Sequence, residues 1–409
     1  MLRNSLRVSI WRLRFANGNC LSLWFAFFGF LAISGCHRKS PEVVSIGHVA
    51  SFRGPAKLSG DHAKQGIQLA LQEAQGDEGT VKDRRIEVIH VDSGGDPKAV
   101  EAATVRLAVI NRVVAFLSGT DSVQSAAMDG VARNNEIPLV TSGGLPGRGT
   151  SDFVFRTGLS PEAQAKKLAE YASQHQTPPI RKIAILVNGT DQGPSSFLAD
   201  QFSKEFLGQK EKGNSLAGKW TYQKYRKNTA GSEGEWEFKS AEELKEIMDQ
   251  IRKSKPDAIF LSGAASDLPQ LQKSGLDQSL PLFFAGEEGS EPILRTAGGS
   301  QPIYLVTAFA LTGDALQRDF VTQYEKQFRE PPDVHAALAY DNMRILIDAL
   351  RRASSPKPIK IKEALEDMKD FQTLTGKASF CKDGHWLDRE PFVARVLDGQ
   401  SKVVWPVGH

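Results

Sequence analysis

The sequence contains little cysteine, with three residues of this type among 409. Cys20 and Cys36 lie close to the N-terminus, so Cys381 is the one thiol left in the body of the chain. One thiol cannot form an intramolecular disulfide, and without a Cys/His cluster at ligand spacing we expect no metal site and no cofactor. We interpret Cys381 as a small packed residue.

Motifs of the common enzyme classes are also missing. We find no Gly-x-Ser-x-Gly nucleophile elbow, no His-Glu-x-x-His zinc motif and no Walker A lysine. The eight histidines are scattered along the chain, and the glycine-rich residues 143–149 lack the spacing of a phosphate-binding loop. We therefore do not predict an enzyme.

An excess of charge of one sign is absent from the body of the chain. The formal net charge is +3, but Arg3, Arg7, Arg12 and Arg14 lie within the first 35 residues, which hold no acidic residue. Without these four positive charges the net charge is −1. Phosphate binding needs a concentrated basic face, so nucleic acid is not an expected partner. The length favours two lobes over one core.

The N-terminal segment has the pattern of an export signal. Basic residues are followed by an apolar run over 21–33, which is shorter than the about 20 residues that a membrane-spanning helix needs. The run ends in Leu31-Ala-Ile-Ser-Gly-Cys36, which resembles the bacterial lipobox, whose cysteine is acylated and becomes the first residue. We predict a lipoprotein signal peptide over 1–35, a lipid anchor on Cys36 and a tether over 36–41; an ordinary signal peptide is the alternative.

From residue 42 onward, strand-like apolar runs alternate with helical patterns. This alternation is typical of βαβ units and parallel sheets, with ligands bound at the carboxyl ends of the strands. We predict an α/β fold of two doubly wound parallel-sheet lobes joined by a multi-strand hinge near 155–158. Lobe 1 is predicted over 42–157 plus about 308–372, and lobe 2 over 158–307 plus about 373–409. Residues 208–239 are interpreted as a strand followed by an insertion, and 313–352 as one helical segment.

The loops that follow the predicted strands are rich in serine, threonine, glycine and aspartate, which suits a small polar ligand. Ser122 opens a predicted helix, where its hydroxyl and the free amides of the first turn can bind a carboxylate. Ser142 and Gly143 follow a neighbouring strand. Glu287 and Glu288 follow a strand of the second lobe and can pair with an ammonium group. The alternatives are that Ser122 is a plain helix cap and that the two acids are solvated.

Several stretches resemble the leucine/isoleucine/valine-binding proteins, the branched-chain amino-acid branch of the type I periplasmic binding proteins. They keep the same order across some 340 residues, and the lipobox fits the same family. The stretches are Ser51-Phe-Arg-Gly-Pro55 with Gly60-Asp61 and Gly66, Asp92-Ser-Gly-Gly-Asp-Pro-Lys-Ala99, Ile137-Pro-Leu-Val-Thr-Ser142, Phe153-Val-Phe-Arg-Thr157, Ala339-Tyr-Asp-Asn342, and Leu374-Thr-Gly-Lys-Ala-Ser-Phe380 with Asp383-Gly384.

The resemblance implies a function and a set of site residues. The ligand is held between two closing lobes, and the closed form is read by the permease subunits of an ABC transporter. The family's carboxylate-binding serine falls on Ser122, its backbone contact on Gly143, and its ammonium-binding acid on Glu288, less surely Glu287. We expect a lipid-anchored, exported monomer that binds an amino acid or a similar small polar ligand.

This sequence departs from the family at the side-chain pocket. The hydroxyl residue after the backbone contact is Leu145, for which Ser142 can substitute. The aromatic residue of the first loop falls near Ser59, with Phe52 as the nearest ring, and that of the second lobe falls at Ala264 or Ala265. The head-group site is therefore partly kept, and the side-chain pocket is altered. A ligand-sensing receptor of the same fold, signalling to a membrane partner, is the alternative function.

The lipobox generates a direct test. We expect Cys36→Ser to give a protein that carries no lipid and is either released or retained with its signal peptide uncleaved. Incorporation of labelled palmitate and membrane fractionation measure this, with Cys20→Ser as the control in the removed segment. Normal acylation of the Cys36→Ser protein would disprove the anchor.

Overall fold

The computed structural model describes most of the chain from residue 41 onward. The predicted signal peptide over 1–35 and most of the tether over 36–41 lie outside the described residues, as do the predicted positions Cys36, Leu145, Glu287, Glu288 and Cys381. The described residues are 41–54, 56–76, 81, 83–143, 152–190, 193–209, 213–226, 236–286, 291–309, 314–374, 376–380, 387–388 and 391–406. The contacts group Glu42–His409 into one unit.

The first sheet is parallel throughout, with strand order β2-β1-β3-β4-β5. Buried apolar residues dominate β3 and also occur in β1, as with Ile46 and Val49. The strands are β1 (Glu42–Ala50), β2 (Arg84–Asp92), β3 (Ala115–Ser118), β4 (Leu139–Thr141) and β5 (Val154–Arg156).

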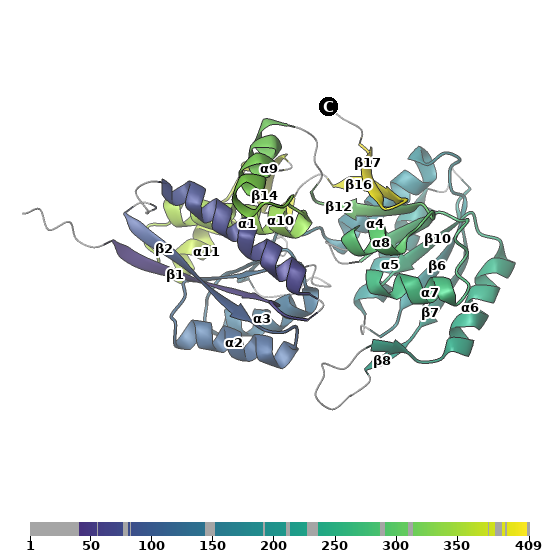
Figure 1. Ribbon diagram of the computed structural model, residues 1–409, viewed down its shortest axis with the longest axis horizontal. Coiled ribbons are helices and arrows are strands. Elements are labelled where there is room, and N and C mark those ends of the chain that lie inside the picture. Colours follow the sequence, from purple (N-terminus) through teal and green to yellow (C-terminus); the bar gives the residue numbers. More distant parts are fainter. Residues whose placement is uncertain are drawn as a thin grey trace, which may run out of the picture. The chain divides into compact units, whose positions relative to one another are not determined.

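Helices cover both faces of this sheet. One core joins the sheet to α1, α9, α10 and α11, and a second core joins its other face to α2 and α3. Figure 1 shows α1 and α10 on one side of the strands and α2 and α3 on the other. The helices are α1 (Lys57–Gln75), α2 (Pro97–Val109), α3 (Ser122–Asn134), α9 (Ala315–Phe328), α10 (Val334–Arg352) and α11 (Pro358–Glu366).

The second sheet has seven strands in the order β17-β16-β12-β11-β10-β6-β7. Five are parallel, and β16 and β17 are antiparallel additions at one edge. The strands are β6 (Lys182–Asn188), β7 (Ser215–Tyr222), β10 (Ala258–Ser262), β11 (Leu282–Ala285), β12 (Ile303–Thr307), β16 (Phe392–Leu397) and β17 (Gln400–Trp405). The predicted doubly wound alternation is confirmed, with the correction that the second sheet is mixed.

The helices of this second half pack on two cores, one on each face of the sheet. A π-helical turn, η2 (Tyr171–His175), extends α4, and a 3₁₀ turn, η4 (Ala265–Asp267), precedes α7. The helices are α4 (Pro161–Glu170), α5 (Pro194–Gly208), α6 (Ala241–Ser254), α7 (Leu268–Lys273) and α8 (Glu291–Ala297). The predicted insertion contains a two-stranded sheet of β8 (Lys224–Arg226) and β9 (Trp236–Phe238).

The chain passes between the two sheets after β5, after β12 and again before β16. The small strands β13 (Phe371–Thr373), β14 (Gly376–Phe380) and β15 (Leu387–Asp388) precede this last passage. Phe380 and Leu387 pack in the first core, although lobe 1 was predicted to end near residue 372. Multiple connections of this kind are what a hinge between lobes requires, and the lobe boundaries stay a prediction.

The helical segment predicted over 313–352 is wrong in one respect, because it is two helices. Arg329 ends α9 in the left-handed conformation, with φ of 64°. Pro331 and Pro332 follow and cannot donate backbone hydrogen bonds, and the Asp333 side chain then caps α10. The break places the N-terminus of α10 beside the ends of the first sheet's strands.

Two glycines of α1 allow unusually close packing. A Cβ atom on Gly66 would lie 2.1 Å from the carbonyl oxygen of Ala336 on α10, and one on Gly60 would lie 2.0 Å from the carbonyl oxygen of Ser51. Both neighbours are backbone atoms, which cannot rotate away. The sequence therefore needs glycine at both positions for α1 to reach α10 and the end of β1.

We expect Gly66→Ala to lower the free energy of unfolding by about 1–3 kcal/mol, because the added methyl group overpacks the contact between α1 and α10. Chemical denaturation measures this change. Gly130→Ala is the matched control, since Gly130 lies within α3 and its Cβ would meet no atom within 4 Å. The control should be neutral or slightly stabilising, and equal effects of the two variants would contradict the packing argument.

Candidate functional site

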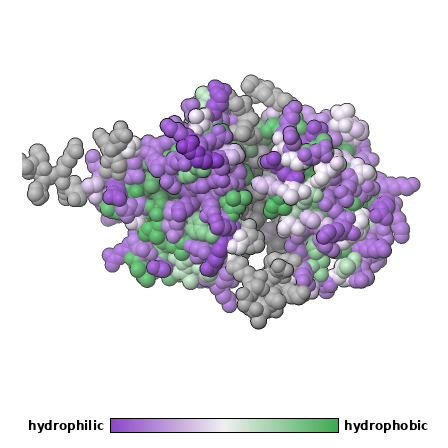
Figure 2. Space-filling model, viewed as in Figure 1, coloured by the Kyte–Doolittle hydropathy of each residue, from purple (hydrophilic) through white to green (hydrophobic). Residues whose placement is uncertain are grey.

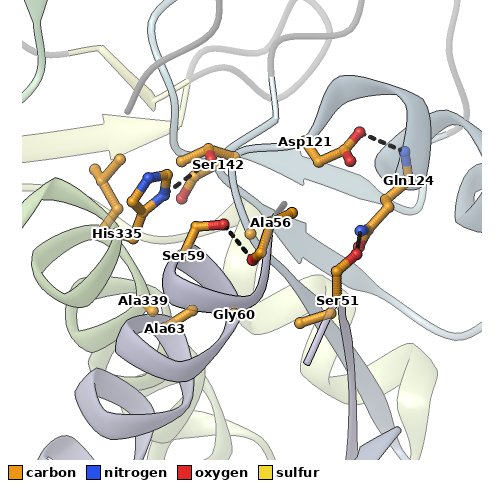
Figure 3. Close-up of a pocket in the computed structure, with 14 residues that line it drawn as sticks. Ser51, Ala56, Ser59, Gly60, Ala63, Asp121, Gln124, Ser142, His335 and Ala339 are labelled. Carbon is orange, nitrogen blue, oxygen red and sulfur yellow. Dashed lines mark hydrogen bonds between the residues drawn. The ribbon is translucent and has the colours of Figure 1, made fainter. Parts of the chain in front are cut away.

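A hollow of about 420 Å³ lies at the carboxyl ends of the first sheet's strands (Figure 3). The ends of β1, β3 and β4 meet there with the first turns of α1, α3 and α10. The lining residues are Ala50, Ser51, Ala56, Ser59, Gly60, Ala63, Gly119, Thr120, Asp121, Gln124, Ser142, His335, Leu338 and Ala339. Three helix N-termini thus converge on one small polar space, the place where parallel α/β sheets bind ligands.

Asp121 and Gln124 form the start of α3. Asp121 is the helix N-cap, and its Oδ1 accepts hydrogen bonds from the backbone amides of Val123 at 2.8 Å and Gln124 at 2.9 Å. The Gln124 side chain donates through Nε2 to Ser51 Oγ at 2.8 Å, which links α3 to the end of β1. Burial raises the pKa of the Asp121 carboxyl, and its hydrogen bonds to Gln124 and Val123 oppose that rise.

Ser142 connects the end of β4 to α10. Its hydroxyl accepts a hydrogen bond from Asn342 Nδ2 at 2.9 Å and lies 3.0 Å from Thr157 Oγ1. Thr157 in turn donates to Asn342 Oδ1 at 2.5 Å. All three side chains are buried. Ser142 is therefore held in a network that ties the residue after β5 to the long helix.

The N-terminus of α10 carries the ionisable groups on the other side of the hollow. Asp333 caps the helix by accepting from the Ala336 amide, and His62 of α1 lies 2.7 Å from Asp333 through Nδ1. His335 Nδ1 lies 3.1 Å from Thr120 Oγ1. Figure 3 shows His335 approaching the hollow from the side opposite Ser51 and Gln124.

The contact between His62 and Asp333 shifts the pKa of each side chain. The hydrogen bond with Asp333 raises the pKa of His62, against the effect of burial. Burial acts to raise the pKa of Asp333, yet the hydrogen bond from His62, the charge of His335 and the Ala336 amide together lower it. The contact between α1 and α10 therefore favours the ionised form of both side chains.

The structure brings some of the predicted site residues to the hollow. Ser59 and Ser142 line it, and Gly143 is buried directly after Ser142. A Cβ atom on Gly143 would lie 2.4 Å from Ser125 Oγ, so a side chain has no space there. The Gly143 amide donates to Thr141 Oγ1 at 3.0 Å.

Other predicted residues are placed differently. Ser122 is the first residue of α3 and is half-buried; the interpretation of Ser122 as the helix cap is wrong, because Asp121 has that role. The first-turn amides expected to be free are bonded to Asp121. Phe52 packs edge-on against His48 and His90 and is not among the lining residues. Ala264 follows β10 of the second sheet.

Asp121, Gln124, Thr120 and His335 are lining residues that our reading of the sequence missed. The signal for two of them is present, because Asp121-Ser-Val-Gln124 has the spacing of a capping box, with an N-cap residue followed three positions later by Gln. His335 carries no local signal. It reaches the hollow because α10 packs on α1, some 270 residues earlier in the chain.

The second sheet has its own polar cluster at the carboxyl ends of β7 and β10. Asp267 Oδ1 lies 2.6 Å from Lys224 Nζ, and its Oδ2 accepts from the Tyr222 hydroxyl at 2.7 Å. Both side chains of the ion pair are buried, at 8% and 4% exposure. The Lys224 amide donates to Thr190 Oγ1, after β6. These bonds fix the strand ends of the second sheet where its loops begin.

Comparisons with known proteins agree on one family. The model of the family described as "Periplasmic binding protein" matches residues 43–203 and 234–401. The Leu/Ile/Val-binding protein homolog 3 of Brucella melitensis is 23% identical over 364 residues, which cover 87% of this chain and 92% of that protein.

Solved structures share the fold. The branched-chain amino acid transporter substrate binding protein LivJ from Streptococcus pneumoniae, in complex with isoleucine, matches with a TM-score of 0.69 and 22% identity, covering 89% of this chain and 99% of that one. A solute binding protein of an ABC transporter from Rhodopseudomonas palustris, in complex with 3,4-dihydroxy benzoic acid, matches with a TM-score of 0.70 and 18% identity, covering 88% and 96%.

The His62–Asp333 contact predicts a pH dependence of stability. A histidine with a raised pKa contributes stability that is complete below its unfolded pKa of about 6.5 and is lost as pH rises through the folded pKa. We expect His62→Gln to remove this loss above pH ~6.5, measured by urea unfolding across a pH series. His90→Gln is the control: burial lowers the pKa of His90 to about 4, so its contribution is lost on acidification instead. An unchanged alkaline profile for His62→Gln would contradict the assignment.

Proposed function

Since the chain belongs to the periplasmic binding protein family, we propose that it is the extracytoplasmic substrate-binding component of an ABC transporter and captures an amino acid or a similar small polar ligand. The observation that carries this proposal is the hollow at the ends of β1, β3 and β4. The family is one of binding proteins, which supports a role in binding.

The chemistry of the hollow supports a small polar ligand. The hollow lies at the carboxyl ends of parallel strands, where α/β sheets bind ligands. Hydroxyl, amide, carboxylate and imidazole groups surround a floor of small residues such as Ala63 and Ala339. The ligands of the two structural neighbours, isoleucine and 3,4-dihydroxy benzoic acid, are small polar molecules. Glu288 stays the predicted partner of a ligand ammonium group from the second lobe.

Capture requires closure around the ligand. The several passages of the chain between the two sheets support a hinge, and α10 carries residues of both cores, with Val334 and Leu338 in that of the second sheet. To invert a 1:99 open-to-closed population, the ligand must bind the closed form more tightly by roughly 5.5 kcal/mol. No covalent step is needed.

The location follows from the family and from the N-terminal sequence. The family places the protein outside the cytoplasmic membrane, and the lipobox supports attachment there through lipid on Cys36. Within the ranges that the structure describes, no helix is long and apolar enough to span a bilayer. On the face shown in Figure 2, hydrophilic side chains dominate and apolar ones form small groups. The partners are then the small ligand, the permease subunits and the membrane lipid.

We expect a ligand at 100 times its dissociation constant to stabilise the purified protein by about 2.7 kcal/mol. A thermal-shift series of α-amino acids, small amides, urea and small carboxylates measures this. Ser59→Phe, which fills the hollow, should abolish the shift, and Ser354→Phe, at an exposed position after α10, should keep it. A shift with amides or carboxylates alone would remove the amino-acid assignment, and no shift with any compound would contradict small-ligand capture.

A further inference from the structure

Asp121 places a carboxylate where a ligand carboxylate was expected. Its Oδ1 occupies the amides of Val123 and Gln124, the first-turn donors of α3. A helix N-terminus attracts anions through those donors and its positive dipole end. Here the protein's own anion already fills that role. A second carboxylate at the same position would meet a like charge, which is unfavourable in a partly desolvated site.

The Asp121 carboxylate also has no cationic partner in the described part of the chain. Its hydrogen bonds come from two backbone amides and from the neutral Gln124 side chain. The other buried carboxylates near the strand ends differ in this respect. Asp267 is paired with Lys224, and Asp333 with His62. Among the described lining residues, Asp121 is the one carboxylate that faces the hollow.

From this contrast we infer that Asp121 accepts a hydrogen bond from a nitrogen donor of the ligand, an ammonium or a primary amide group. The α3 end of the hollow then selects N–H donors over carboxylates. The inference rests on the proposed small-ligand function and adds to it the orientation and chemical class of the ligand. An amino acid would bind with its nitrogen, and not its carboxylate, toward α3.

Two further observations support this assignment. Burial raises the pKa of Asp121, and an N–H donor from the ligand would favour its ionised form. The Gln124 side chain is held by Ser51, so the carboxylate and its neighbour are already oriented before a ligand arrives. His335 and Ser59 line the opposite side of the hollow, where His335 Nδ1 lies 3.1 Å from Thr120 Oγ1 and the Ser59 hydroxyl donates to the Ala56 carbonyl oxygen.

The test compares nitrogen compounds with carboxylates of similar carbon skeleton. Isothermal titration of the full-length protein with benzamide against benzoate isolates the amide, and leucinamide against 4-methylpentanoate adds the ammonium. We expect the nitrogen compound of each pair to bind at least 10-fold more tightly. Asp121→Ser keeps an N-cap residue and removes the negative charge, so it should reduce this preference at least 10-fold.

Asp96→Ser is the matched control, because Asp96 caps α2 in the same way, accepting from the Ala99 amide at 2.9 Å, and does not line the hollow. It should leave the preference unchanged. Tighter binding of benzoate or 4-methylpentanoate to the wild type, an unchanged preference in Asp121→Ser, or an equal loss in Asp96→Ser would overturn the role of Asp121 while leaving ligand capture in place. No binding of any of the four compounds would also overturn the role of Asp121, and the thermal-shift series would then decide whether ligand capture stands.

Discussion

The close approach of α1 to its neighbours is the constraint on which the site depends. Gly60 lies against the backbone of Ser51 and Gly66 against that of Ala336, and neither contact has space for a methyl group. The two contacts hold the first turn of α1 at the end of β1 and beside the start of α10. Without them, Ser59 and His335 would not line the same hollow.

Helix capping then determines which polar groups of the helix N-termini are left for a ligand at the hollow. Parallel strands bring helix N-termini to one edge of a sheet, and each N-terminus offers unpaired amides. In this protein Asp121 and Asp333 fill those positions on α3 and α10. Asp333 is balanced by His62, whereas Asp121 is bonded to neutral groups in the described structure. The two caps look alike in sequence and differ in what they leave for a ligand.

Much of the fold could be predicted from local patterns. The alternation of strands and helices from residue 42 onward and the helix starting at Ser122 appear where the sequence patterns indicated. The split between α9 and α10 was missed, although Pro331 and Pro332 are strong helix breakers. The C-terminal segment was assigned to lobe 2, but the antiparallel pairing of β16 and β17 at the edge of the second sheet was missed, because a strand's partners depend on contacts that local patterns do not contain.

The sequence by itself determined the family, the alternating α/β organisation and the candidate segments of the site. Hydrophobic periodicity and glycine positions are local properties, and the order of the motifs can be read along the chain, so none of them depends on tertiary contacts. The tertiary structure decided which candidates meet. Ser59 and Ser142 reach the hollow, while Phe52 turns to His48 and His90. His335 and Asp121 become lining residues only because helices distant in sequence pack at the same sheet edge.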